Sequence, residues 1–162
     1  MSQPLFRIGI GYDIHTLKAG RRCVLGGVEI PSDVGPDGHS DADVLCHAVA
    51  DAILGAAGLR DIGFYFPNTD PACKDMNSLD IVRRAVAEVE KTGYCIQNVD
   101  AAMIAEKPKV GPHIDAIKAS LAKVLGIPEN CVGVKATTNE KLDDLGAGLG
   151  IAVHAVCLIA RK

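Results

Sequence analysis

The sequence predicts a small α/β protein, a layered α+β fold in which helices cover one face of a mixed β-sheet. Segments with the alternation of strands and segments with helical periodicity follow one another along the whole chain. The 162 residues are enough for one hydrophobic core, and no internal repeat is visible, so we expect a single domain over residues 1–162. Because there is no Trp and aromatic residues make up only 4% of the chain, Ile, Val, Leu and Ala must supply most of that core.

The N-terminal half is expected to form two strands and then a helix. Apolar alternation marks the strands, and a helical apolar pattern ends where Gly58 can stop a helix. The predicted segments are a strand over 7–14, a strand over 23–30 with a loosened or bulged pair Gly26–Gly27, a loop over 31–37, and a helix over 44–53. Residues 59–71 contain too many helix breakers for a helix, so an ordered loop is expected there.

The C-terminal half is expected to alternate helices with strands. Ser78 suits the cap of one helix, and Gly93 and Gly126 suit the ends of two. The predicted segments are a helix over 79–91, a strand over 95–105, a helix over 113–125, a strand over 132–137 and a strand over 151–160. The last strand is apolar on both faces, which indicates that helices cover one face and something else, such as another subunit, covers the other.

The start of the first helix has two features of a binding site. Ser40 and Asp41 favour the N-cap position, so the residues just before the helix are expected at a helix mouth, where free N–H groups attract an anion. Asp43, His47 and Asp51 are spaced four residues apart and therefore share one helix face. We expect this polar stripe to form part of a site.

Asp13 and His15 form a second candidate group. They alternate along the first predicted strand, so both project from the same face. Together with His47 they would supply one carboxylate and two imidazoles, which is the ligand count of a catalytic zinc site with one open position. The spacing alone leaves two interpretations open: a metal site, or a helix histidine that packs against polar groups.

The composition excludes several classes of partner. A net charge of −3 argues against a general nucleic-acid binder. No apolar run is long enough to span a bilayer, and the N-terminus lacks the pattern of a secretory signal, so no membrane partner and a bacterial cytoplasmic location are expected. The six cysteines include no Cys-x-x-Cys pair and are expected to be free thiols.

Five motifs, two of which include the residues described above, are recognisable by their order along nearly the whole chain. They are Gly-Tyr-Asp-Ile-His at 11–15, Gly-His-Ser-Asp-Ala-Asp at 38–43 with His47, Asp-Ile-Gly at 61–63 with Phe-Pro-Asn-Thr-Asp at 66–70, Lys-Pro-Lys at 107–109, and Lys-Ala-Thr-Thr-Asn-Glu-Lys at 135–141. Each motif is short, but five in this order form a specific pattern. In these motifs the chain resembles the 2-C-methyl-D-erythritol 2,4-cyclodiphosphate synthase family of the non-mevalonate isoprenoid pathway.

The resemblance implies a reaction and an assembly. The family forms homotrimers of small α/β subunits with active sites between neighbouring subunits. The substrate is linked to cytidine diphosphate: it is 4-diphosphocytidyl-2-C-methyl-D-erythritol 2-phosphate. Its 2-phosphate attacks the β-phosphorus of its own diphosphate, which yields the cyclic diphosphate and CMP. Such an enzyme is a phosphorus–oxygen lyase.

The resemblance also implies roles for individual residues. Asp13, His15 and His47 match the family's metal ligands, usually for zinc, and Glu140 matches the ligand of a magnesium or manganese ion on the diphosphate. His39 and Thr138 match the catalytic residues that stabilise the transition state. The matched substrate-binding residues near the metal and the erythritol are Asp13, Ile14, His15, His39, Ser40, Asp61, Ile62, Gly63, Phe66, Pro67, Asn68, Thr69 and Asp70. Those of the cytidine and diphosphate pocket, supplied by the adjacent subunit, are Ala105, Glu106, Lys107, Pro108, Lys109, Val110, Gly111, Thr137, Thr138, Asn139 and Glu140.

The chain departs from the family pattern at one place. Asp144 and Ala147 stand where the bacterial pattern carries Phe and Arg, beside a cavity on the trimer axis that can hold an isoprenoid diphosphate. Without the Arg we expect weak binding there. Two alternatives to the synthase remain: a metal-binding trimer without activity, and a metal-dependent phosphohydrolase that would release free phosphate rather than CMP.

Overall fold

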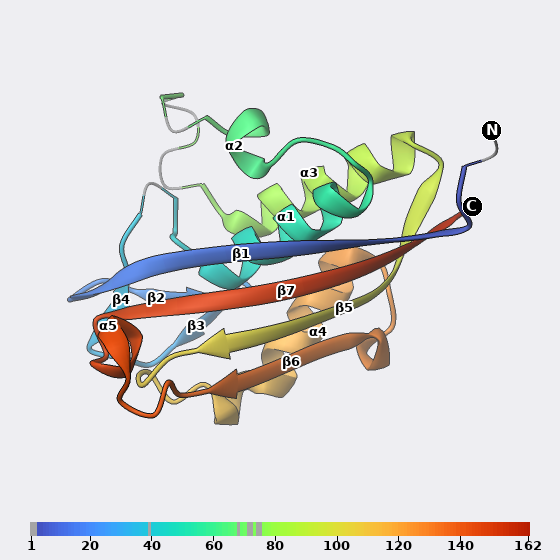
Figure 1. The fold of residues 1–162 in the computed structure, drawn as a ribbon. Coiled ribbons are helices and arrows are strands. Elements are labelled where there is room, and N and C mark those ends of the chain that lie inside the picture. The colour runs from blue at the N-terminus through green and yellow to red at the C-terminus, as the bar shows by residue number, and fades with distance from the viewer. Residues whose placement is uncertain (1–2, 39, 68, 71–72, 74–75) are drawn as a thin grey trace.

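A mixed sheet with helices on one face forms the protein, as the sequence predicts. The computed structural model describes residues 3–38, 40–67, 69–70, 73 and 76–162. In it, five strands form one sheet in the order β4-β1-β7-β5-β6, and β2 and β3 form a separate hairpin. Helices α1, α3 and α4 lie on the same side of the sheet (Figure 1). None of the helices in the described part of the chain combines the length and the apolar character needed to span a bilayer.

The elements follow the predicted order with several additions. They are β1 (Phe6–Ala19), β2 (Cys23–Leu25), β3 (Val28–Ile30), β4 (Val34–Pro36), α1 (Val44–Ala56), α2 (Ile62–Tyr65), α3 (Ser78–Lys91), β5 (Tyr94–Ile104), η2 (Gly111–His113), α4 (Ile114–Leu125), η3 (Glu129–Cys131), β6 (Val132–Thr137), α5 (Asp143–Gly146) and β7 (Gly150–Arg161).

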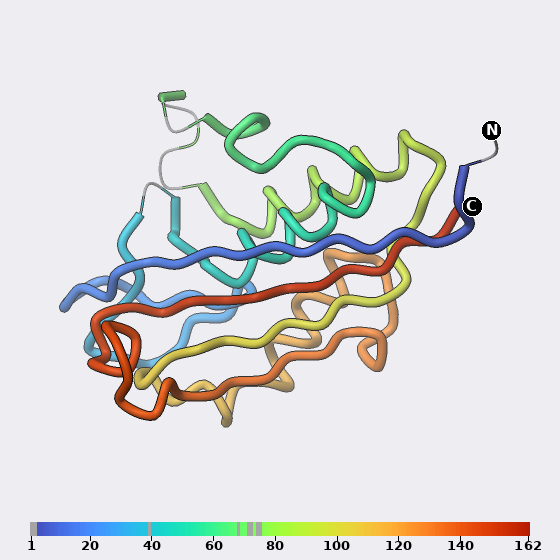
Figure 2. The backbone as a smooth tube through the Cα atoms, viewed as in Figure 1, coloured from blue at the N-terminus to red at the C-terminus, as the bar shows by residue number. Residues whose placement is uncertain are grey.

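The two long strands β1 and β7 run side by side through the sheet (Figure 2). They pair antiparallel from Phe6–Ala160 to Thr16–Gly150. β7 also pairs antiparallel with β5, whereas β5 and β6 are parallel and α4 connects them. A crossover helix of this kind is what a parallel pair requires.

Helix α1 lies almost directly on the backbone of β1. A Cβ at Gly9 would lie 2.2 Å from the Ala52 carbonyl oxygen, and a Cβ at Gly11 would lie 1.9 Å from that of Ala48. Only glycine permits so close an approach. Because residues of odd number in this part of β1 face α1, the same contact points Asp13 toward the helix.

Three segments differ from the prediction. The segment 23–30 is a hairpin, not one strand: Gly26 and Gly27 both have positive φ, as a two-residue type I′ turn requires. The segment 31–37 is not all loop, since it contains β4, which pairs with the end of β1. The segment 59–71 contains the single-turn helix α2.

Two helix starts also differ from the prediction. Asp43, rather than Ser40 or Asp41, is the N-cap of α1, and its side chain accepts from the Cys46 N–H. Asn77, rather than Ser78, is the N-cap of α3. Several residues in each stretch have suitable side chains, and tertiary contacts select one of them.

The face of the sheet opposite the helices carries an apolar surface. In the single chain Val156 of β7 is 45% exposed on this face, the face for which the sequence predicts a cover such as another subunit. On the neighbouring strand, Ile8 is 73% and Ile10 is 70% exposed. We call this surface the outer patch; its members are Ile8, Ile10, Tyr12, Ile14 and Val156.

Candidate metal centre and substrate cavity

Asp13, His15 and His47 converge on one point between β1 and α1. Asp13 Oδ2 lies 3.0 Å from His15 Nε2 and 3.0 Å from His47 Nδ1. The two imidazole nitrogens are 3.4 Å apart. All three side chains are largely buried, and among the described residues they form a group that could hold a metal ion. The structure therefore brings together the residues that the sequence only suggested as partners.

We call the triangle formed by Asp13 Oδ2, His15 Nε2 and His47 Nδ1 the metal triangle; it has the size of one face of a tetrahedral metal site. Donor atoms at zinc bond lengths of about 2.0–2.1 Å lie about 3.3 Å from one another in a tetrahedron. Each imidazole also has its second nitrogen engaged: His15 Nδ1 lies 2.7 Å from the Asp37 carbonyl oxygen, and His47 Nε2 lies 3.0 Å from Ser78 Oγ. A ring that donates from one nitrogen keeps a lone pair on the other. The donor set fits a divalent metal with an open fourth position.

The electrostatics of the triangle keep the carboxylate ionised. Burial alone would raise the pKa of Asp13, but hydrogen bonds to His15 and His47 and the charge of those imidazoles lower it to about 2. Burial lowers the pKa of His15, but the hydrogen bond to Asp13, the charge of that carboxylate and the contacts with Asp37 together raise it. A charged carboxylate is the form in which Asp13 can bind a cation.

Asp43 was predicted to line the site together with His47 and Asp51, but the structure shows that it has a structural role instead. Its carboxylate is fully buried and accepts from the N–H groups of Gly26 and Gly27 at 2.9 and 2.7 Å as well as from Cys46. The Asp43 carboxylate thus caps the N-terminus of α1 through the Cys46 N–H, and the predicted anion site at the helix mouth stays a prediction.

A cavity of about 330 Å³ opens beside the triangle. Asp13 and His47 form part of its wall, and Ser40 lies there with Oγ 3.2 Å from His47 Nε2. Asp51 connects α1 to α2 across the cavity wall, because its Oδ1 accepts from the Ile62 N–H at 2.8 Å. The other lining residues are Asp61, Gly63, Phe66, Cys73, Met76 and Ile81.

The predicted cytidine and diphosphate residues surround a different cavity of the same chain, of about 200 Å³. It lies at the ends of β5 and β6, and its lining consists of Ala105, Glu106, Pro108, Lys109, Val110, Gly111, Ile114, Ala136, Thr137 and Thr138. Glu140 lies close by, with Oε1 3.2 Å from Thr138 Oγ1. Glu140 and Lys141 both have positive φ, an unfavourable conformation that is typical of functional loops.

The remaining predicted residues are placed as follows. His39 and Asn68 lie outside the described residues. The side chain of Ile14 belongs to the outer patch, on the face opposite the metal triangle. Pro67, Thr69 and Asp70 follow Phe66 in the chain without appearing in the cavity wall, Lys107 lines a neighbouring cavity with Pro108 and Lys109, and Asn139 donates to Asp143 at 2.7 Å.

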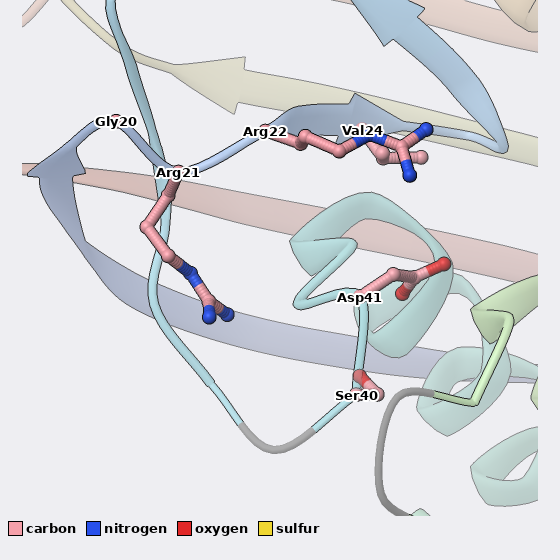
Figure 3. Close-up of a pocket in the computed structure, with 6 residues that line it drawn as sticks. All are labelled: Gly20, Arg21, Arg22, Val24, Ser40 and Asp41. Atoms are coloured by element: carbon pink, nitrogen blue, oxygen red, sulfur yellow. The ribbon is translucent and has the colours of Figure 1, made fainter.

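Another cavity, of about 410 Å³, also includes Ser40 in its wall (Figure 3). Its other lining residues are Gly20, Arg21, Arg22, Val24 and Asp41. From its wall, Arg21 reaches the segment before Ser40 and donates to the Gly38 carbonyl oxygen at 3.2 Å. Lys18 pairs with the Asp37 carboxylate at 2.6 Å. These contacts hold the backbone whose Asp37 carbonyl fixes the ring of His15.

Sequence reasoning missed several residues of the site. Asp37 contributes only a backbone carbonyl, so no side-chain pattern could identify it. Ser78, Cys73 and Met76 reach the site through the return of the chain into α3, which is a through-space contact. The only available signal for Ser78 was its position at a helix start.

Comparison with known proteins gives consistent results over the whole chain. A relative from Akkermansia muciniphila, a 2-C-methyl-D-erythritol 2,4-cyclodiphosphate synthase, is 57% identical over 160 residues, which are 98% of this chain and 95% of the relative. The solved structure of IspF from Plasmodium falciparum in complex with CDP matches with a TM-score of 0.87 at 38% identity, over 99% of both chains.

A second solved structure is longer than this chain. The bifunctional IspDF of Campylobacter jejuni matches with a TM-score of 0.93 at 38% identity over 97% of this chain, which spans 42% of that protein. The profile of the YgbB family matches residues 6–160. The chain therefore belongs to the YgbB family.

Proposed function

We propose that this protein is a 2-C-methyl-D-erythritol 2,4-cyclodiphosphate synthase, with residues 1–162 acting as one domain. It converts 4-diphosphocytidyl-2-C-methyl-D-erythritol 2-phosphate into the cyclic diphosphate and CMP, as a phosphorus–oxygen lyase. The observation that carries the proposal is the triangle of Asp13, His15 and His47, two of which, Asp13 and His47, line a cavity. Full-length relatives named for this activity, and a relative in complex with CDP, support the substrate class.

The chemistry suits the residues available. The attacking group is already a phosphate oxyanion, so no general base is needed, and the main obstacle is repulsion between phosphates. We assign zinc to Asp13, His15 and His47, and magnesium or manganese on the diphosphate to Glu140. Bound there, such ions supply Lewis-acid stabilisation worth several kcal/mol.

The other residues position the substrate and stabilise charge. Because the reaction is intramolecular, folding the substrate into a reactive shape supplies much of the acceleration. We assign Asp61–Gly63 and the 66–70 segment to the erythritol, and 105–111 with 137–140 to the cytidine and diphosphate. His39 and Thr138 are assigned to transition-state stabilisation, and Ser40 to the phosphate beside the metal.

We also propose a homotrimer in which neighbouring subunits share each site. Within one chain the two groups of residues are far apart: β7 and β5 separate β1 from β6, which makes three strand spacings, or roughly 14 Å. A large exposed apolar surface such as the outer patch is typical of an interface. The proposed location is the cytoplasm, which suits an enzyme with a nucleotide-linked substrate.

Turnover with and without a chelator tests the function. We expect CMP and the cyclic diphosphate in equal amounts, loss of both with the chelator, and recovery when divalent metal is restored. Release of inorganic phosphate would instead identify a phosphohydrolase. Metal-loaded protein that gives no product would indicate a metal-binding protein without this activity.

A further inference from the structure

A buried series of hydrogen bonds lies behind His47, on the side away from Asp13 and His15. Ser78 is fully buried, and its Oγ lies 3.0 Å from His47 Nε2. The Ser78 hydroxyl donates to Asp41 Oδ1 at 2.5 Å, and its backbone N–H donates to Asp41 Oδ2 at 3.0 Å. The start of α3 and the segment just before α1 thus meet behind His47.

The direction of these hydrogen bonds follows from Asp41, the last group in the series. An ionised carboxylate only accepts, so the Ser78 hydroxyl hydrogen points to Asp41. Ser78 Oγ is then left with lone pairs facing His47, so this contact is a hydrogen bond when Nε2 carries the hydrogen. Ser40 Oγ, 3.2 Å from Nε2, is a second oxygen that can accept from it. Ser40 is compatible with this direction: its Oγ accepts from the Ala42 N–H at 3.1 Å and lies 3.4 Å from Ser78 Oγ.

We propose that Ser78, oriented by Asp41, is a positioning residue that fixes the tautomer and the ring angle of His47. With Nε2 as the donor, the lone pair of His47 lies on Nδ1, which is the nitrogen that faces Asp13 and His15. The inference rests on the proposed metal site and adds residues that set its affinity. Partners of this kind behind a metal ligand typically change metal affinity 10- to 100-fold.

The hydroxyl of Ser78 is not needed to cap the helix that it begins. Asn77 is the N-cap of α3, and its Oδ1 accepts from the Leu79 N–H at 2.9 Å. Asn77 has no contact with His47 among the described interactions. The neighbouring pair Asn77 and Ser78 therefore separates helix stability from metal positioning.

The experiment compares Ser78→Ala with Asn77→Ala in the full chain. Zinc affinity is measured by competition with a chromophoric chelator, the visible spectrum is recorded with Co²⁺ in the site, and thermal unfolding midpoints are recorded. We expect Ser78→Ala to weaken zinc binding 10- to 100-fold and to shift the Co²⁺ spectrum. Asn77→Ala is expected to lower the unfolding midpoint while leaving affinity and spectrum unchanged.

Three results would overturn the inference. Wild-type affinity and spectrum in Ser78→Ala would show that Ser78 only packs, and an equal loss in Asn77→Ala would assign the effect to helix stability. If the wild type itself bound no more zinc than His47→Ala, the proposed metal site would fail together with the inference. Should Ser78→Ala not fold, Ser78→Cys replaces it, because a thiol of similar size accepts only weakly and the same weakening is expected.

Discussion

At the scale of single residues, His47 connects the metal triangle to the interior. We expect His47→Ala to lose bound zinc and catalytic activity together, because a site with two remaining ligands holds the metal poorly. Metal content of the purified protein and CMP release measure the two effects. His113→Ala, in the short turn Gly111–His113, is the control and should retain zinc. Full zinc content in His47→Ala would contradict the ligand set.

Gly11 determines how closely α1 approaches β1. A methyl group at this position would lie 1.9 Å from the Ala48 carbonyl oxygen, so Gly11→Ala must displace the helix that carries His47. We expect a loss in the free energy of unfolding of about 3 kcal/mol, together with weaker zinc binding. Gly111→Ala is the matched control, since nothing lies within 4 Å of a Cβ there. Equal stability of the two variants in denaturant unfolding would contradict the argument.

At the scale of elements, Asp43 joins the β2–β3 hairpin to α1. Asp43→Ala removes the helix cap and leaves the N–H groups of Gly26 and Gly27 without their acceptor. The expected cost is about 2–4 kcal/mol in the free energy of unfolding, from the cap and from the buried donors. Asp115→Ala in the first turn of α4, where the side chain is exposed, should change it by less than about 0.5 kcal/mol.

The elements that the sequence predicted well are those with long, regular patterns. Helices α3 and α4 and strands β5, β6 and β7 have an apolar periodicity that depends only on their own residues. Strand β4 could not be predicted, because three residues form a strand only by pairing with β1. The site divides in the same way: Asp13 and His15 follow from alternation on one strand, whereas Ser78 enters through the packing of α3 against α1.

At the scale of the whole molecule, the outer patch leads to a prediction about assembly. We expect Ile10→Asp to dissociate the proposed homotrimer, because an isoleucine that is 70% exposed in the single chain would become a charge at the proposed interface. Analytical ultracentrifugation measures the change, and the monomer should be inactive. Ala116→Asp on the exposed side of α4 is the control and should stay trimeric. A monomeric wild type, or a trimeric Ile10→Asp variant, would contradict the proposed interface.

The most direct test of a shared active site is a mixture of two inactive subunits. His47→Ala disables the metal triangle, and Thr138→Ala disables the segment that we assign to the neighbouring subunit. The two variants are co-expressed with different tags, and trimers carrying both tags are purified and assayed for CMP. In every trimer that carries both tags, one of the three sites joins two intact halves, so about a third of wild-type activity is predicted. Mixed trimers as inactive as either variant alone would contradict a site built from two subunits.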